Sequence, residues 1–314
     1  MKAGRVSAIP FAQRNGKAEF NASGVVQVGP DRFVFTDNRD PTALFELVLN
    51  PDGTQREPIR RRPLSGPVPG ALSDPEGLTR IDVDGGITLV MSSSLAVRDK
   101  TVSHDGLVRV RYTPDGDLTA EDMPGFRDWV VQQHPELAAA ADLDADDGGL
   151  NIERVAWDPV RGTLLFGIRS PVTDAGIPVL RVRLDPAAPW TTAALENHPI
   201  IFISRTNSCA MQGIRAISYD ADSGGFLVLL GRSISGGEAP FELCTWDGMG
   251  PSVRALDFRF AKSMKPEGVT AFRTDGSRRI LIVGDWGASP PWASTDDPQQ
   301  RNAPAGTGRR AGAC

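Results

Sequence analysis

The sequence has little cysteine, little histidine and no long apolar run. Among 314 residues the three cysteines, Cys209, Cys244 and Cys314, are too few and too widely spaced for a disulfide framework or a zinc knuckle. The three histidines are equally isolated, so a metal site built on imidazole is not expected. No window approaches the roughly 18 apolar residues of a membrane span, and no apolar export signal stands near Met1. We therefore expect a cytoplasmic protein with no membrane partner, unless a leader precedes this sequence.

The charge is also without a basic excess. Lys and Arg number 34 against 39 Asp and Glu, which gives a net charge of -5, and the arginines are scattered among acids. Nucleic acid is therefore not an expected partner. The 33 Gly and 25 Pro residues are typical of many short strands joined by turns.

What the sequence does have is an internal repeat. Residues 151–170, NIERVAWDPVRGTLLFGIRS, predict a strand, a turn and a second apolar strand. The same unit occurs five times, at intervals of about 50 to 77 residues. Such a period indicates a repeat architecture. The first strands of the five copies carry, in chain order, Ser23, Glu76, Glu153, Arg215 and Glu267.

The strand pattern predicts an all-β fold, a β-propeller of five or six blades. The second strand of each copy is apolar almost throughout, and the run that follows most copies alternates apolar and polar residues, as inner and outer strands of a blade do. The spacing of apolar residues predicts a short helical insertion at about 118–145, over one mouth of the ring. We expect an irregular segment at 1–20 that could close the ring, the propeller at 21–287, and a disordered tail at 288–314.

Polar residues recur at matching positions of the copies. In a propeller the first strand lines the central channel, so the residues that open it, Glu76, Glu153, Arg215 and Glu267 above all, should converge, and we regard these four as candidate catalytic residues. The second strands end at candidate ligand-binding residues near a mouth: Asp37, Ser93, Arg169, Arg232 and Asp285. Buried charges need a partner. Either the acids and arginines neutralise one another as a structural network, or they bind a ligand.

Four segments resemble recurring signatures of the bacterial DUF3616 family, whose function is uncharacterised. The segments are Asp74-Pro-Glu-Gly-Leu, Leu150-Asn-Ile-Glu-Arg-Val-Ala, Gly213-Ile-Arg-Ala-Ile-Ser-Tyr and Pro266-Glu-Gly-Val. The resemblance covers about residues 20–287 and implies a propeller without supplying a reaction. A looser similarity to phytase-like and esterase-like propellers rests on the Glu-Gly pairs. Arg154 departs from the pattern, because the family usually has Gly after this Glu.

Calcium is the one cofactor that the acidic residues suggest. Asp142, Asp144, Asp146 and Glu153 have the 1, 3, 5 and 12 spacing of a calcium loop, but Asp147 replaces the Gly needed at position six. Calcium held by Glu76, Glu153 and Glu267 is the stronger of the two alternatives. No phosphate loop, His-Glu-x-x-His motif or dinucleotide fingerprint is present.

Two functions stay open at this point. The first is a propeller that binds a small polar or anionic molecule at one mouth and could act as a hydrolase of phosphoesters, esters or lactones, with or without a metal. In that function a channel carboxylate serves as base or metal ligand, and Arg215 or Arg169 stabilises negative charge. The alternative is a non-catalytic scaffold that binds protein partners on its outer faces.

Overall fold

The computed structural model describes residues 4–5, 20–66, 73–102, 105–206, 211–235, 239–260, 264–274, 276–284, 287–288 and 292–293. The described chain is all-β with two short helices. None of the described helices is long and apolar enough to cross a membrane.

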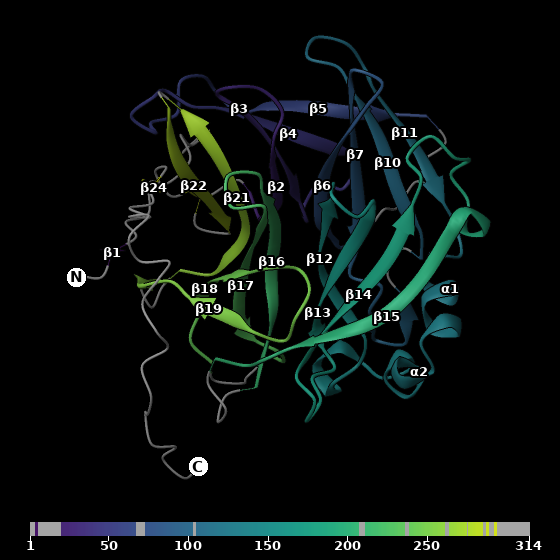
Figure 1. Ribbon diagram of the computed structural model, residues 1–314. Helices are drawn as coiled ribbons and strands as arrows, with labels where there is room; N and C mark the ends of the chain where they lie inside the picture. Colours follow the sequence, from purple (N-terminus) through teal and green to yellow (C-terminus); the bar gives the residue numbers. More distant parts are fainter. Residues whose placement is uncertain are drawn as a thin grey trace.

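Five sheet repeats follow one another along the chain (Figure 1). Each first strand pairs antiparallel with the second, and the second with the third. The strands of the first two repeats are β2 (Ala22–Gln27), β3 (Arg32–Asp37), β4 (Ala43–Val48), β5 (Arg60–Ser65), then β6 (Pro75–Val83), β7 (Gly86–Ser93), β10 (Leu107–Tyr112) and β11 (Leu118–Met123). Those of the third and fourth are β12 (Asn151–Asp158), β13 (Thr163–Ser170), β14 (Ile177–Leu184), β15 (Leu195–Ile203), then β16 (Gln212–Asp220), β17 (Gly225–Arg232), β18 (Glu242–Trp246) and β19 (Val253–Ala255).

The last repeat is β21 (Pro266–Thr274) and β22 (Ser277–Gly284), with both β23 (Gly287–Ala288) and β24 (Trp292–Ala293) paired to β22. Three residues of the segment expected as a tail, Ala288, Trp292 and Ala293, therefore belong to a sheet, and the chain from 294 on lies outside the described residues. At the other end, β1 (Gly4–Arg5) pairs in parallel with β20 (Phe258–Arg259). The remainder of 1–19 is also outside the described part.

The five first strands form a ring. β2 contacts β6, β6 contacts β12, β12 contacts β16, β16 contacts β21, and β21 contacts β2 (Figure 1). The fold is therefore propeller-like, with each sheet radiating outward from its first strand. The second strands are buried almost throughout, as expected, because neighbouring sheets cover both of their faces. Between the sheets lie the apolar clusters that hold the ring together.

The first two repeats share one continuous sheet, because β5 pairs in parallel with β11. Arg62 on β5 is 3% exposed, and its guanidinium donates to the carboxylate of Glu46 and to the backbone carbonyls of Thr113, Pro114 and Gly116. The Tyr112 hydroxyl also donates to Glu46, and together with burial this contact raises the pKa of Tyr112 to about 12. A buried, fully bonded arginine therefore fastens the two repeats together.

The helical insertion is shorter than predicted. Residues 118–123 form strand β11, and the helices are α1 (Phe126–Gln133) and α2 (Pro135–Ala141), followed by the 3-10 turn η1 (Ala145–Asp147). The helix prediction is wrong for 118–123 because β11 pairs with β10 and buries every second residue of its first half. Buried residues of both helices pack into the core between the second and third repeats. A short hairpin, β8 (Val97–Arg98) with β9 (Thr101–Val102), and a second 3-10 turn, η2 (Thr192–Ala194), complete the described elements.

Candidate functional site

Each first strand carries a β-bulge at its candidate residue. The pairing with the second strand skips Glu76 in β6, Glu153 in β12, Arg215 in β16 and Glu267 in β21, and it skips Ser23 with Gly24 in β2. A bulge leaves one residue outside the ladder and re-aims its side chain. The repeat thus places one polar side chain of each first strand at the centre of the ring.

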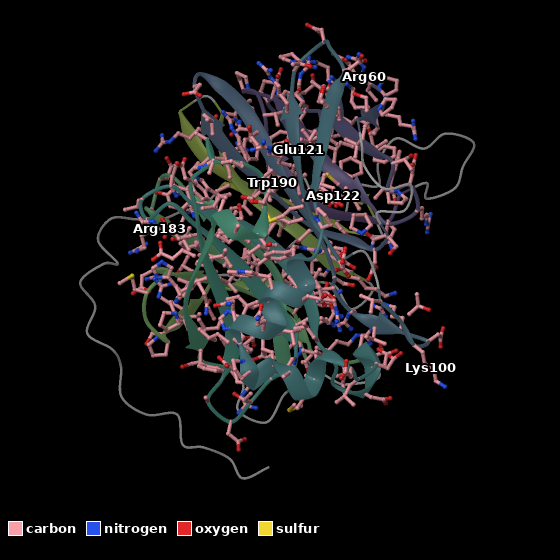
Figure 2. All side chains as sticks on the ribbon, turned by 90° about the vertical axis from the view of Figure 1, so that its right-hand side faces the viewer. Arg60, Lys100, Glu121, Asp122, Arg183 and Trp190 are labelled. Carbon is pink, nitrogen blue, oxygen red and sulfur yellow. The ribbon has the colours of Figure 1, made fainter. Side chains whose placement is uncertain are left out.

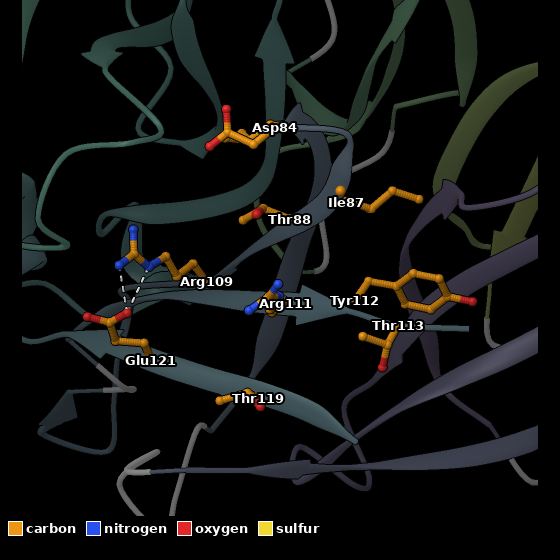
Figure 3. Close-up of a pocket in the computed structure, with 11 residues that line it drawn as sticks. Asp84, Ile87, Thr88, Arg109, Arg111, Tyr112, Thr113, Thr119 and Glu121 are labelled. Carbon is orange, nitrogen blue, oxygen red and sulfur yellow. Dashed lines mark hydrogen bonds and ion pairs between the residues drawn. The ribbon is translucent and has the colours of Figure 1, made fainter. Parts of the chain in front are cut away.

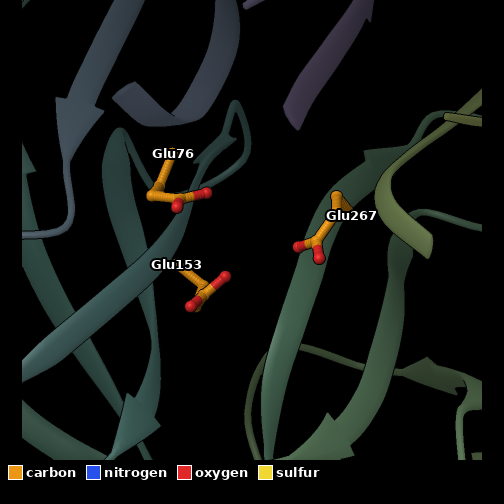
Figure 4. A group of neighbouring side chains, drawn as sticks. All are labelled: Glu76, Glu153 and Glu267. Carbon is orange, nitrogen blue, oxygen red and sulfur yellow. The ribbon is translucent and has the colours of Figure 1, made fainter. Parts of the chain in front are cut away.

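The three carboxylates converge at that centre, as the alignment of the copies predicts. Carboxylate oxygens of Glu76, Glu153 and Glu267 lie within 4.8 Å of one another (Figure 4). Glu76 and Glu153 are buried, and the Glu267 side chain is 14% exposed. Three acids this close cannot remain charged together without cationic partners.

Three arginines supply those partners. Arg215 donates to Glu153 (Nη1 to Oε1, 3.2 Å) and to Glu267, and Arg169 donates to the same Glu153 oxygen at 2.9 Å. Arg154 donates to Glu76 Oε2 at 3.0 Å and to Glu267 Oε2 at 3.3 Å. The three acids and three arginines thus form one continuous network. It spans four of the five repeats, because Glu76, Arg154, Arg215 and Glu267 lie on β6, β12, β16 and β21.

The first repeat completes the surroundings of Glu76. The Ser23 hydroxyl donates to Glu76 Oε2 at 3.2 Å, and the Asn38 amide donates to Glu76 Oε1 at 3.1 Å. Neither residue brings a charge. Glu76 is therefore the acid with the least cationic contact of the three, since Arg154 is its only guanidinium partner among the described residues.

Arg154 is the residue of this cluster that sequence reasoning did not place there. It follows the bulged Glu153, where the other repeats have Gly24, Gly77, Ala216 and Gly268. Its side chain is 2% exposed and, besides the two carboxylates, it donates to the backbone carbonyls of Glu76, Glu153 and Glu267. The sequence could have indicated this, because Arg154 stands where three of the other repeats have Gly. A long cationic side chain at that position has to extend into the ring centre.

The residues at the ends of the second strands behave differently from one another. Of the four that the structure describes, Arg169 joins the cluster. Asp37 accepts hydrogen bonds from the backbone N–H groups of Asn21 and Arg39, which caps a turn. Ser93 is buried and accepts from the backbone N–H of Leu95.

Two further candidates on those strands gain no support. Arg232 ends β17 opposite Gln212, and no contact joins it to the three carboxylates in the described part of the chain. Asp285 lies outside the described residues. Among the four described second-strand ends, Arg169 is therefore the one that contacts the three carboxylates.

Three buried polar atoms of the cluster have no hydrogen-bond partner: Glu153 Oε2, Arg169 Nε and Arg215 Nε. All three belong to the residues that meet at Glu153. Leaving a buried donor or acceptor unpaired costs about 1–3 kcal/mol, so such atoms are rare unless a water or ligand satisfies them. This side of the cluster has one acceptor and two donors to offer.

Burial and charge push the three carboxyl pKa values in different directions. Burial, and then the neighbouring charge of Glu153, holds the pKa of Glu76 well above its usual value. Burial also raises the pKa of Glu267. The pKa of Glu153 is lowered, because Arg215, Arg169 and Arg154 together outweigh the effect of its burial. The arginines thus stabilise the negative charge of Glu153, while burial disfavours that of Glu76.

A calcium ion does not fit this cluster well. Five of the six carboxylate oxygens already accept a hydrogen bond, and Glu153 Oε2 is the one that does not. Four of these five accept from a guanidinium, and the fifth, Glu76 Oε1, accepts from the Asn38 amide. Calcium takes six to eight oxygen ligands, and here it would also face three arginine charges. The ligand type is right, but the oxygens are engaged.

The acidic loop before β12 is not a calcium loop either. Its twelfth position, Glu153, is bound to Arg169 and Arg215 in the ring centre. Asp144 instead caps η1, where Oδ1 accepts from the N–H of Asp146, and its other oxygen accepts from the N–H of Asp99. Helix capping accounts for this part of the acidic spacing.

Comparisons with known proteins do not place the chain in a family. No protein-family profile matches it, and no curated protein matches it. Among solved structures it is similar to a periplasmic gluconolactonase from Pseudomonas aeruginosa, at 10% identity and a TM-score of 0.42, over 83% of this chain and 78% of that one.

It is also similar to a Lactobacillus plantarum protein, at 11% identity and a TM-score of 0.39, over 84% of this chain and 64% of that one. A third similarity is to the extracellular domain of a hybrid two-component system from B. thetaiotaomicron, at 11% identity and a TM-score of 0.36, over 90% of this chain. The chain spans 64% and 39% of the lengths of these last two proteins. At such TM-scores the likenesses carry no argument about the site.

Proposed function

We propose that the chain is a five-bladed propeller that binds a small polar or anionic molecule at the mouth of the ring where the first strands begin. The observation that supports this most is the set of unpartnered buried atoms around Glu153: one carboxylate oxygen and the Nε–H groups of Arg169 and Arg215. A molecule with an acidic or carbonyl oxygen and a neighbouring hydroxyl would satisfy all three. The five-blade count rests on the ring of five first strands.

The partly exposed side chains set the direction of approach. Arg169 is 12% and Glu267 14% exposed, whereas Arg154 and Glu153 are almost fully covered. A ligand would therefore reach the cluster past Arg169 and Glu267. Guanidinium groups suit planar or tetrahedral oxygen groups, which favours carboxylates, lactones, esters and phosphoesters as ligands.

Within this proposal the same cluster can hydrolyse an ester or lactone without a metal. Glu153, which keeps its charge, would take a proton from an attacking water through Oε2. Arg169 and Arg215 would stabilise the oxyanion that forms on the carbonyl oxygen. Glu76, whose pKa is raised by burial, would return a proton to the leaving oxygen. Two carboxyl groups whose environments separate their pKa values are suited to such a division of roles.

Binding can be tested without knowing the substrate. Melting curves would be recorded with panels of sugar lactones, carboxylates and phosphoesters for the wild type, Arg169→Gln and the control Arg183→Gln, whose guanidinium lies on the outer part of the third repeat. A ligand of this site should raise the melting temperature of the wild type and the control but not of Arg169→Gln. Glu153→Gln should keep binding and lose hydrolysis.

A purely structural network of acids and arginines predicts the opposite result. If the acids and arginines serve only to neutralise one another, no compound of these classes should stabilise the wild type more than Arg169→Gln. Elemental analysis of the purified protein separates the metal-assisted version: a stoichiometric ion would show that calcium or another cation displaces the guanidinium contacts. Loss of ligand binding without such an ion would leave a protein-binding scaffold as the better hypothesis.

A further inference from the structure

A second site lies on the outer strands of the second repeat. Residues of β7, β10 and β11, with the turn between β6 and β7, line a pocket of about 650 Å³ (Figure 3). Asp84 in this turn follows β6 at the end opposite to Glu76. At about 3.3 Å per residue the two residues lie roughly 25 Å apart, so the pocket is separate from the ring centre.

Arg111 lies in the middle of the pocket between two threonines. It pairs in register with Thr88 of β7 on one side and with Thr119 of β11 on the other (Figure 3). Directly opposed residues on neighbouring strands have Cβ atoms about 5 Å apart, so one guanidinium and two hydroxyl groups share one face of the sheet. Arg111 is exposed and forms no ion pair among the residues that the structure describes.

The other arginine of the pocket is already engaged. Arg109 donates to Glu121 from Nε at 2.8 Å, with Nη2 2.7 Å from the same oxygen. Its guanidinium also lies 5.2 Å from the ring centroid of Trp190, which Figure 2 shows near Glu121 on the same side of the molecule. Glu121 thus neutralises Arg109 and leaves Arg111 as the cation with donors to spare.

The third repeat provides an internal comparison. Its strand β14 carries the same motif, VLRVRL at 179–184 against LVRVRY at 107–112, so Arg183 is the counterpart of Arg111. Arg183 faces Thr163, as Arg111 faces Thr88, but its other neighbour is Glu196, with Nε 3.9 Å from Oε2. In the second repeat Thr119 takes the place of that acid. The arginine is neutralised in one repeat and left with hydroxyl neighbours in the other.

We propose that this pocket binds the phosphate or sulfate group of a small molecule, with Arg111, Thr88 and Thr119 as its donors. A guanidinium fork offers two parallel N–H groups, and the hydroxyl groups add donors from either side. Four donors from three directions match a tetrahedral oxyanion better than a planar carboxylate. The remainder of the pocket then accommodates the body of the molecule.

The test uses inorganic phosphate, inorganic sulfate and a hexose phosphate as probes, titrated by calorimetry at constant ionic strength with chloride as the balancing ion. Wild type and Arg183→Gln should bind the probes equally, and Arg111→Gln about tenfold or more weakly. Thr119→Glu recreates the environment of the third repeat and should abolish binding as well. Tighter binding of the hexose phosphate than of phosphate identifies an ester as the ligand, and equal binding identifies the free oxyanion.

Two results would overturn the proposal. One is that the wild-type protein binds none of the probes, or that Arg111→Gln binds them as tightly as the wild type. The other is phosphate binding lost in Arg169→Gln and retained in Arg111→Gln, which would place the anion in the ring centre. Circular dichroism of each variant verifies that folding is intact, and the exposed positions Arg111, Thr119 and Arg183 should tolerate the changes.

Discussion

Replacement of Arg154 by Met tests whether the central network depends on this unexpected residue. The change keeps much of the apolar stem and removes a guanidinium that contacts two carboxylates and three backbone carbonyls. Removing one partner of a buried ion pair costs about 3–5 kcal/mol, because the remaining charge is left without compensation. We expect a loss of that size in the free energy of unfolding at pH 8, measured by urea denaturation.

The loss should depend on pH. A folded-state pKa above the unfolded value means that the folded protein holds the proton more tightly. The resulting stability is fully present below about pH 4, near the pKa of an unfolded Glu, and is lost as pH rises towards the folded pKa. Arg154 opposes the rise in the pKa of Glu76 and Glu267, so removing it raises both further. The variant should therefore be closer to wild type at pH 5 than at pH 8.

The exposed Arg183 provides a matched control for Arg154. Arg183→Met removes an arginine whose side chain is 61% exposed, and it should change the free energy of unfolding by at most about 0.5 kcal/mol. If Arg154→Met unfolds within about 1 kcal/mol of wild type at pH 8, the guanidinium is not compensating buried charge, and the network described above is not what holds the ring centre.

Three further predictions concern the rest of the molecule. Gly268→Ala should destabilise the protein by about 1–3 kcal/mol in urea, since the new Cβ would lie 2.2 Å from the carbonyl oxygen of Ser23 where the last repeat meets the first; an unchanged midpoint would contradict that contact. Arg61 lowers the pKa of Asp40 to about 2, so the stability that this pair contributes should be present above about pH 4 and lost towards pH 2, and acid denaturation of Asp40→Asn should lack that component. Burial raises the pKa of the Cys244 thiol to about 12, so peptide mapping should show it alkylated only after unfolding, and labelling in the native state at pH 8 would refute its burial.

The convergence of the acids could be predicted from the sequence because the repeat fixes equivalent positions. Once the copies are aligned on their Asp and Gly turns, Glu76, Glu153, Arg215 and Glu267 fall at the start of successive inner strands, and the ring brings those starts together. The bulges that aim the side chains inward could not be predicted. Their register is set by how each first strand packs against the next repeat, which no local pattern of residues encodes.

Outer strands were harder to predict than inner ones for a physical reason. β5, with the sequence RRRPLS, is mostly exposed and buries only Arg62 fully, so it lacks the apolar alternation of a half-buried strand. β11 alternates only over its first four residues, Leu118 to Glu121, and the helical spacing of the following segment masks this short pattern. Both strands are held by their partners across the junction of the first two repeats. That pairing is tertiary, and local propensity does not determine it.

The bulges also explain why convergence of charge is not by itself evidence of function. The glycines at the bulges of the first two repeats pack closely on the next repeat: a Cβ on Gly24 would lie 2.6 Å from the backbone nitrogen of Leu78, and one on Gly77 would lie 2.8 Å from that of Val155. At these two positions the close approach of the next repeat requires Gly, whereas the third repeat has Arg154 at the equivalent position.

Any sequence that closes this ring must satisfy the polar groups so gathered, and Arg154 does this for Glu76 and Glu267. The atoms that closure does not require are those around Glu153, where an acceptor oxygen and two guanidinium donors stay unpaired on the partly exposed side of the cluster. Each such atom costs about 1–3 kcal/mol when it is buried and unsatisfied, so a water or a ligand is expected to pair with it. A ligand at Glu153 is our proposal for these atoms, and the melting curves of wild type and Arg169→Gln test it against a structural network that water completes.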